Sequence, residues 1–432
     1  MKHDRSLRTA IWIVCLGIFT VVEGGFSESS LARSAEQKVA AITVGGTAAD
    51  ITGFTSEAIQ QAADELKSRA DGGVIKLTPG IFHIKAPVRL YSLQELTGSG
   101  KETVLRKIDG FSTNLVIDAD YGERQLTVAD RAGFEPGMAV HIYDTEHNNA
   151  WEVSTAVITM IEGNVLFLDE YLLRDYRADK GGGVSTASAI IASLETEGVQ
   201  IRDLIVDGNR QRNEFINGCR GGGIYLYNVR DALVENVTVR DFNGDGISWQ
   251  MTWNVTVRNC TVSGCSKDGL HPGAGSYNTL IQGNTSTNND RHGLYICWRV
   301  QNGLVIDNRL HHNKRSGICT GHKDNDMVFE QNQIYENREA GVLLRKEREL
   351  NAPHNNLFRN NTIENNGSEG SGYGFLIDSP VKGLVLKGNT IRDTGIGAQR
   401  AAVYLYRRDL PVSLKDNIIS GHKAGEIVYG DR

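Results

Sequence analysis

Acidic and basic side chains recur at a nearly constant spacing in the second half of the chain. Asp245, Asp268 and His292 each precede a glycine and stand 23 and 24 residues apart. Paired carboxylates can act as general acid and general base, and an arginine such as Arg345 can hold an anionic substituent. Because the spacing is regular, a repeating fold would bring these groups together.

The glycines after these residues belong to a longer repeat: Gly223, Gly246, Gly269, Gly293, Gly317, Gly341 and Gly374. The intervals are 23, 23, 24, 24, 24 and 33 residues. Apolar side chains at the first and third positions after each glycine alternate with other residues, which predicts strands with one buried face. Such a period predicts stacked coils. Valine, isoleucine and glycine dominate where a leucine-rich repeat would carry leucine, and this argues against that alternative.

Asparagines form a second repeat: Asn236, Asn259, Asn284, Asn308, Asn332, Asn361, Asn389 and Asn417. Asparagine tolerates the left-handed backbone of a sharp turn. Stacked asparagines also hydrogen-bond to one another along an axis. We therefore expect one ladder of these amides along the coils.

The outward strand positions and the strand ends collect the candidate site. The candidate catalytic residues are Asp245, Asp268, His271, His292, Tyr295 and Arg345. The candidate substrate-binding residues are Gln250, Arg291, Trp298, His322, Lys323, Asp324 and Glu347. We expect them to share one groove on the outer face of one sheet, with Asp245 and Asp268 about 5 Å apart. The alternative is structural, because Asp-Gly is a common turn dipeptide.

The fold class that follows is all-β: a right-handed parallel β-helix with an N-terminal capping helix and a small antiparallel β insertion. Thr55 caps an amphipathic run over 56–69, and a helix there would cover the open end of the coils. Short alternating runs with glycine turns over 125–185 predict the insertion. Residues 41–124 then form the cap and first coils, and residues 186–432 the remaining coils.

The first 25 residues are typical of a secretory signal peptide. Lys2, Arg5 and Arg8 precede the apolar run 10–22, which is short for a membrane span. A short N-terminal anchor is the alternative. Secretion or export to the periplasm is therefore expected, with no membrane span in the mature chain. The net charge of −6 and the lack of a basic block argue against nucleic acid as a partner.

Five cysteines follow the signal segment: Cys219, Cys260, Cys265, Cys297 and Cys319. The odd number and the absence of CxxC spacing predict small buried residues rather than a disulfide framework or a zinc site. No cofactor is expected, and a Ca²⁺ requirement stays open.

The coil region, residues 195–425, resembles the pectate-lyase-like β-helix superfamily. The order Asp-Gly, Asp-Gly, His-Gly and then Arg345 is similar to polygalacturonase-type hydrolases. Lys267 stands where that family has its general acid, and Leu343 where it has a basic residue. The segment NNDRHG at 288–293 is similar to a motif of mannuronan epimerases, which implies that Arg291 and His292 face a uronate. The Asp-Pro-His triplet of that family is Ser-Trp-Gln at 248–250 here.

These features predict an enzyme that acts on a polysaccharide or oligosaccharide. The first hypothesis is hydrolysis of a glycosidic bond, with Asp245 and Asp268 as acid and base, His292 orienting a carboxylate, and Arg345 and Lys323 holding an acidic or sulfated group. The second is β-elimination or C5 epimerisation of a uronate. There His271 or Tyr295 removes the C5 proton, and Arg291 or Arg345 neutralises the carboxylate. The third is a non-catalytic β-helix that binds glycan.

Overall fold

A computed structural model describes residues 40–368, 371–395 and 398–430 of the chain. The predicted signal peptide lies outside these residues. Within the described ranges, no helix has the length and apolar character needed to cross a membrane.

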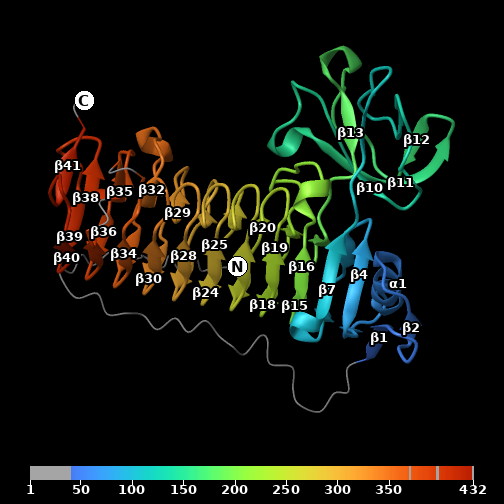
Figure 1. The fold of residues 1–432 in the computed structure, drawn as a ribbon, viewed down its shortest axis with the longest axis horizontal. Coiled ribbons are helices and arrows are strands. Elements are labelled where there is room, and N and C mark those ends of the chain that lie inside the picture. The colour runs from blue at the N-terminus through green and yellow to red at the C-terminus, as the bar shows by residue number, and fades with distance from the viewer. Residues whose placement is uncertain (1–39, 369–370, 396–397, 431–432) are drawn as a thin grey trace, which may run out of the picture. The chain divides into compact units, whose positions relative to one another are not determined.

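Three parallel sheets run side by side along stacked coils, and each full coil adds one strand to each sheet (Figure 1). Sheet A consists of β2 (Ile51–Thr52), β1 (Ala41–Gly45), β3 (Gly73–Leu77), β6 (Gln94–Thr97), β15 (Gln200–Arg202), β18 (Leu233–Glu235), β21 (Thr256–Arg258), β24 (Leu280–Gln282), β27 (Leu304–Ile306), β30 (Val328–Glu330), β33 (Leu357–Arg359), β36 (Leu384–Lys387) and β39 (Val412–Lys415). Sheet B consists of β4 (Gly80–Ile84), β7 (Thr103–Lys107), β16 (Ile205–Asp207), β19 (Thr238–Arg240), β22 (Thr261–Ser263), β25 (Thr285–Thr287), β28 (Arg309–His311), β31 (Gln333–Tyr335), β34 (Thr362–Glu364), β37 (Thr390–Arg392) and β40 (Ile418–Ser420). Sheet C consists of β5 (Val88–Leu90), β14 (Ile191–Leu194), β17 (Ile224–Tyr227), β20 (Ile247–Gln250), β23 (Leu270–Gly273), β26 (Leu294–Tyr295), β29 (Ile318–Thr320), β32 (Ala340–Leu344), β35 (Gly372–Ile377), β38 (Gln399–Leu405) and β41 (Ile427–Tyr429).

The glycine repeat predicts the register of sheet C correctly. The first residues after the glycines pair coil by coil in one column: Ile224, Ile247, Leu270, Leu294, Ile318, Val342 and Phe375. All seven are fully buried. The predicted parallel β-helix is thereby confirmed.

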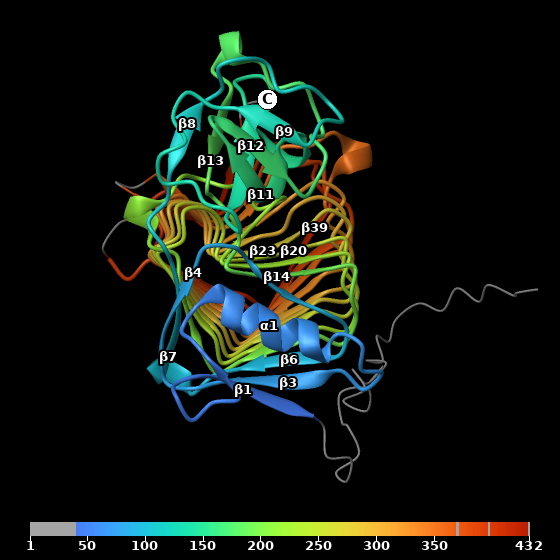
Figure 2. The ribbon, with the colours of Figure 1, turned by 90° about the vertical axis from the view of Figure 1, so that its right-hand side faces the viewer.

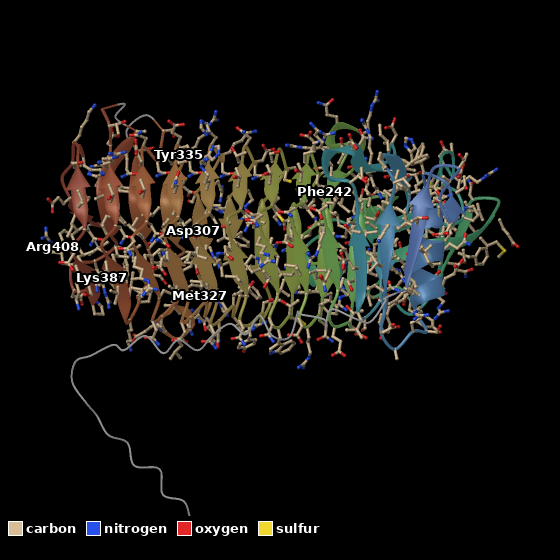
Figure 3. The ribbon with its side chains drawn as sticks, turned by 90° about the horizontal axis from the view of Figure 1, so that it is seen from below. Phe242, Asp307, Met327, Tyr335, Lys387 and Arg408 are labelled. Carbon is tan, nitrogen blue, oxygen red and sulfur yellow. The ribbon has the colours of Figure 1, made fainter. Side chains whose placement is uncertain are left out.

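The prediction that all eight asparagines share one ladder is wrong for the first two. Asn284, Asn308 and the later members form a ladder, buried except at Asn417, in which each side-chain amide donates to the next, as from Asn308 to Asn332 at 2.9 Å. Asn236 and Asn259 instead take positive φ and are exposed, and Cys260 stands in the ladder position before Asn284. In these turns the residue directly before the ladder asparagine has the left-handed backbone. Asp307, before Asn308, has φ 58 (Figure 3).

Replacing Asn308 by alanine is expected to lower the free energy of unfolding by about 1–3 kcal/mol, because its partners would stay buried without it. Asn308 donates to Ile281 O at 2.8 Å and accepts from the N–H of Asn284. Denaturant unfolding measures the change, and Asn148→Ala at an exposed position is the control. Equal stability of the two variants would contradict the ladder's role.

The capping helix forms where the sequence predicts it and ends earlier. Helix α1 spans Ser56–Leu66, and the Thr55 hydroxyl accepts from the N–H of Ala58 at 3.3 Å. Its apolar stripe, including Ile59 and Leu66, is buried. Viewed along the coils, α1 lies across one end of the stack (Figure 2).

The antiparallel insertion is a six-stranded sheet that begins before residue 125. Its strands in spatial order are β8 (Ser112–Asn114), β13 (Gly183–Ser185), β10 (Ala139–Tyr143), β11 (Ser154–Glu162), β12 (Val165–Leu168) and β9 (Gln125–Thr127). It has a buried core of its own. The five cysteines of the described chain are free, and three of them are buried.

Candidate functional site

The site residues lie on sheet C, on the strands β20 to β32 and in the turns next to them. The residues before the strand glycines bind the backbone of the following coil. Asp245 accepts the N–H of Asp268 at 2.9 Å, Asp268 accepts that of His292 at 3.1 Å, and the Nδ1 atom of His292 accepts that of Ser316 at 3.1 Å. These three side chains therefore link each coil to the next.

Asp245 and His271 form a buried ion pair. Oδ2 of Asp245 lies 2.7 Å from Nδ1 of His271, and both side chains are almost fully shielded from solvent. Gly218, in the segment before β17, covers the pair, and a Cβ atom on Gly218 would lie 1.7 Å from Asp245 Oδ2. The Ser248 hydroxyl donates to Gly218 O at 2.6 Å. Only glycine fits at position 218 in this arrangement.

The two members of the pair stabilise each other's charge. Burial alone would raise the pKa of Asp245, but His271 holds the pKa of this carboxyl below its ordinary range. Burial also disfavours a charged imidazole, yet Asp245 outweighs it and raises the pKa of His271 to about 9. His271 is therefore charged at neutral pH and is not available as a base.

The His271 shift predicts how stability depends on pH. A pKa raised from 6.5 to about 9 contributes stability that is complete below pH 6.5 and is lost as the pH rises through 9. The free energy of unfolding should fall over this window in the wild type. The fall should be weaker in His271→Gln, as measured by denaturant unfolding at each pH. Parallel profiles of the two proteins would contradict the assignment.

The Asp268 carboxyl is also buried and lies 3.3 Å from the Arg291 guanidinium. Burial and the Asp245 charge raise the pKa of Asp268 to about 6. Burial likewise raises the pKa of Asp324 to about 6, although Arg345 lies 3.5 Å away and acts against it.

The expectation of an open groove needs correction for six of the predicted residues. The buried ones are Asp245, Gln250, Asp268, His271, His292 and Asp324. The segment around Gly218 accepts hydrogen bonds from Ser248 and Gln250 and lies against Asp245 and His271, so it covers this part of sheet C. Among the six predicted catalytic residues, only Tyr295 and Arg345 are partly exposed.

Two guanidinium groups lie against the ring of Tyr295. Its ring centroid is 4.9 Å from Arg291, in the turn before the same strand, and 4.7 Å from Arg345, two coils further on. The ring of His292 stacks on it at 5.7 Å, and His271 meets its edge at 5.2 Å. Burial raises the pKa of the Tyr295 phenol, and the two arginines offset only part of this rise.

Arg345 is anchored within the sheet. Its guanidinium donates to Ile296 O at 2.9 Å and lies 3.4 Å from the Cys319 sulfur. Gly321 leaves room for it, since a Cβ atom there would lie 2.6 Å from Arg345 Nε. The cation is thus held beside Tyr295 before any substrate binds.

A second group of predicted residues adjoins Arg345. Trp298 is half exposed, with its ring centroid 5.1 Å from that of His322. His322 Nδ1 lies 3.3 Å from the Glu347 carboxylate. Lys323 follows His322 in the chain and is partly buried. The predicted site therefore contains one cluster around Tyr295 and another around Trp298.

Sequence reasoning missed Gly218 and the segment around it. A signal was present, because Ile191 and Ile224 pair in sheet C but stand 33 residues apart instead of 23 or 24. A longer coil marks an extra segment on the surface. It also missed a second buried ladder, formed by Asn289, Asn313, Asn337, Asn366 and Gln399.

Family models match two overlapping parts of the coil region. Residues 189–352 match the model described as "Right handed beta helix region". This chain has the right-handed parallel β-helix fold. Residues 296–430 of this β-helix also match the model "Periplasmic copper-binding protein (NosD)". No curated protein matches the sequence.

Solved structures similar to this β-helix share the fold at low identity. The A-module of the mannuronan C-5 epimerase AlgE4 of Azotobacter vinelandii is 17% identical with a TM-score of 0.51, covering 87% of this chain and 94% of that one. The Dettilon tailspike protein gp208 is 11% identical with a TM-score of 0.52, covering 86% of this chain and 58% of that one.

The copper-binding description prompts a test of the donor set. Across the described ranges, no group of three or more His, Cys, Asp or Glu side chains is arranged to hold a metal ion. The described residues therefore offer no such donor group for copper, and we derive no chemical step through it.

Proposed function

We propose that this β-helix acts on an acidic polysaccharide and removes the C5 proton of a uronate residue, with β-elimination as the reaction. The observation that carries the proposal is the partly exposed Tyr295, whose ring contacts the guanidiniums of both Arg291 and Arg345. Of the partly exposed predicted catalytic residues, only the tyrosine can exchange a proton, because arginine stays charged.

The two arginines would hold the uronate carboxylate. Their charges would stabilise the negative charge that develops on the carboxylate when the C5 proton leaves. Arg345 is anchored by Ile296 O, so its position requires little reorganisation during the reaction.

Tyr295 would serve first as base and then as acid. Its phenolate would take the proton from C5 while the electron pair forms the C4–C5 double bond and the C4–O4 bond breaks. The phenol would then protonate the departing O4 atom. C5 epimerisation shares the first step and needs a second donor on the opposite face of the sugar.

Hydrolysis, the first hypothesis from the sequence, receives less support from the geometry. Asp245 and Asp268 are fully buried, and each accepts a backbone N–H of the following coil. Asp245 is also paired with His271. A carboxyl that protonates a glycosidic oxygen must come within hydrogen-bond reach of it.

A polysaccharide screen tests the proposal. Acidic and neutral polysaccharides are incubated with the protein, and both new reducing ends and the ultraviolet absorbance of unsaturated uronates are measured. The proposal predicts that both signals rise together on a polyuronate. Reducing ends without absorbance would support hydrolysis instead, and binding without either signal would support a non-catalytic glycan-binding protein.

We further propose that the protein works outside the cytoplasm, without a metal or other cofactor and without nucleic acid as a partner. The predicted signal peptide and the match to a periplasmic family model support export. Unchanged activity after chelation is the expected result, and restoration of lost activity by Ca²⁺ would replace this part of the proposal.

A further inference from the structure

The loop between β10 and β11 of the antiparallel insertion contacts the segment that covers the Asp245–His271 pair. Asn217 donates to the Asn149 side chain at 3.3 Å, and Arg220 donates to Trp151 O at 2.6 Å. Asn149 and Trp151 are thereby attached to the coil surface one residue before and two residues after Gly218.

At this contact the rings of Trp151 and Tyr227 are tilted relative to each other. The centroids of Trp151 and Tyr227 lie 5.7 Å apart with 56° between the ring planes, and both residues are partly exposed. The Arg220 guanidinium lies 5.1 Å from the Trp151 ring. Its Nε atom is buried and has no hydrogen-bond partner in the described structure. Aromatic faces suit the apolar face of a sugar ring, and a guanidinium suits a carboxylate.

A second cluster of the same composition has a different geometry. Trp253 and Tyr277 stack almost parallel, with 13° between their planes, and Arg230 lies 4.7 Å from the Trp253 ring. Because the two rings stack nearly parallel, their facing sides cover each other, and a sugar ring cannot enter between them.

The position of Tyr227 relative to Tyr295 follows from the register of sheet C. Tyr227 pairs with Gln250, Gln250 with Gly273, and Gly273 with Cys297, which stands two residues after Tyr295 on the same strand face. Three strand spacings amount to about 14 Å, the length of a short oligosaccharide.

We propose that Trp151, Tyr227 and Arg220 form a second sugar-binding subsite, which holds a uronate of the same polysaccharide chain whose other residue lies at Tyr295. This inference rests on the proposed function and extends it. The insertion then takes part in substrate binding, and the protein selects long chains over short ones.

Calorimetric binding of oligouronates of increasing length tests the subsite. Tyr295→Phe serves as the background, because it prevents turnover in the proposed mechanism. Trp151→Ala and Tyr227→Leu should each weaken binding of a hexasaccharide about tenfold, or about 1.4 kcal/mol, and leave a disaccharide unaffected. Trp253→Ala is the matched control and should bind both ligands like the background protein. Melting temperatures verify that each variant is folded.

The possible outcomes separate the subsite from the proposed function. Unchanged hexasaccharide affinity in both variants, with binding by the background protein intact, would overturn the subsite alone. Equal weakening of short and long ligands would also overturn it, since the residues would then act at or through the Tyr295 site. Failure of wild-type protein and background protein to bind any oligouronate would overturn both proposals.

Discussion

Tyr295→Phe is expected to lower turnover of a polyuronate about 10²–10⁴-fold, the range typical of losing a general acid or base. The substitution removes only the hydroxyl and keeps the ring against Arg291 and Arg345. Substrate affinity should therefore change little, because the two arginines that hold the carboxylate remain in place. Initial rates over a range of substrate concentrations separate the two effects.

The pH profile provides a second readout for Tyr295. Because burial raises the pKa of this phenol, the phenolate is a minor form near neutrality, and wild-type turnover should increase as the pH rises from 7 toward 9. Tyr335→Phe is the control, since Tyr335 stacks on His311 in sheet B (Figure 3). Near-wild-type turnover in Tyr295→Phe would remove this residue from the mechanism.

Asp245→Asn is expected to cost about 3–5 kcal/mol in the free energy of unfolding, the range for breaking a buried ion pair by removing one partner. Asparagine retains an oxygen that can accept the Asp268 N–H, so the substitution isolates the loss of charge beside His271. Denaturant unfolding at pH 6 measures the change, because His271 is charged there.

An exposed ion pair provides the control for Asp245. Arg177 and Asp179 lie 2.7 Å apart with about half of each side chain exposed, so Asp179→Asn should change the free energy of unfolding little. Adding His271→Gln to Asp245→Asn should restore part of the lost stability, because no unpaired charge then stays buried. A cost for Asp245→Asn no larger than that of the control would mean that the pair contributes little.

The coil repeat was predictable because one residue type occupies one structural position. Each strand glycine of sheet C precedes a buried residue, so Leu270 and Leu294 could be placed in one column from their spacing. The asparagines were less reliable, since two adjacent turn positions both accept asparagine. Asn259 takes the left-handed position, whereas Asn284 lies in the ladder, and the interval of 25 residues between them was the available sign.

Burial within the site could not be read from the repeat. His271 occupies an outward strand position, and alternation alone places it in solvent. It is buried because Gly218 lies over it, and the course of a long irregular segment leaves no periodic signal. Neighbouring coils did bring Tyr295 and Arg345 together as their offsets from the repeated glycines predict, although two coils separate their positions.

Loss of the C5 hydrogen with formation of a double bond tests the proposed β-elimination most directly. A polyuronate is incubated with the protein in D₂O and followed by NMR, with Tyr295→Phe in parallel. We expect loss of the C5 proton signal together with new unsaturated chain ends in the wild type, and neither change in the variant. New reducing ends on sugars that retain their C5 protons would contradict it, because the glycosidic bond would then have been hydrolysed.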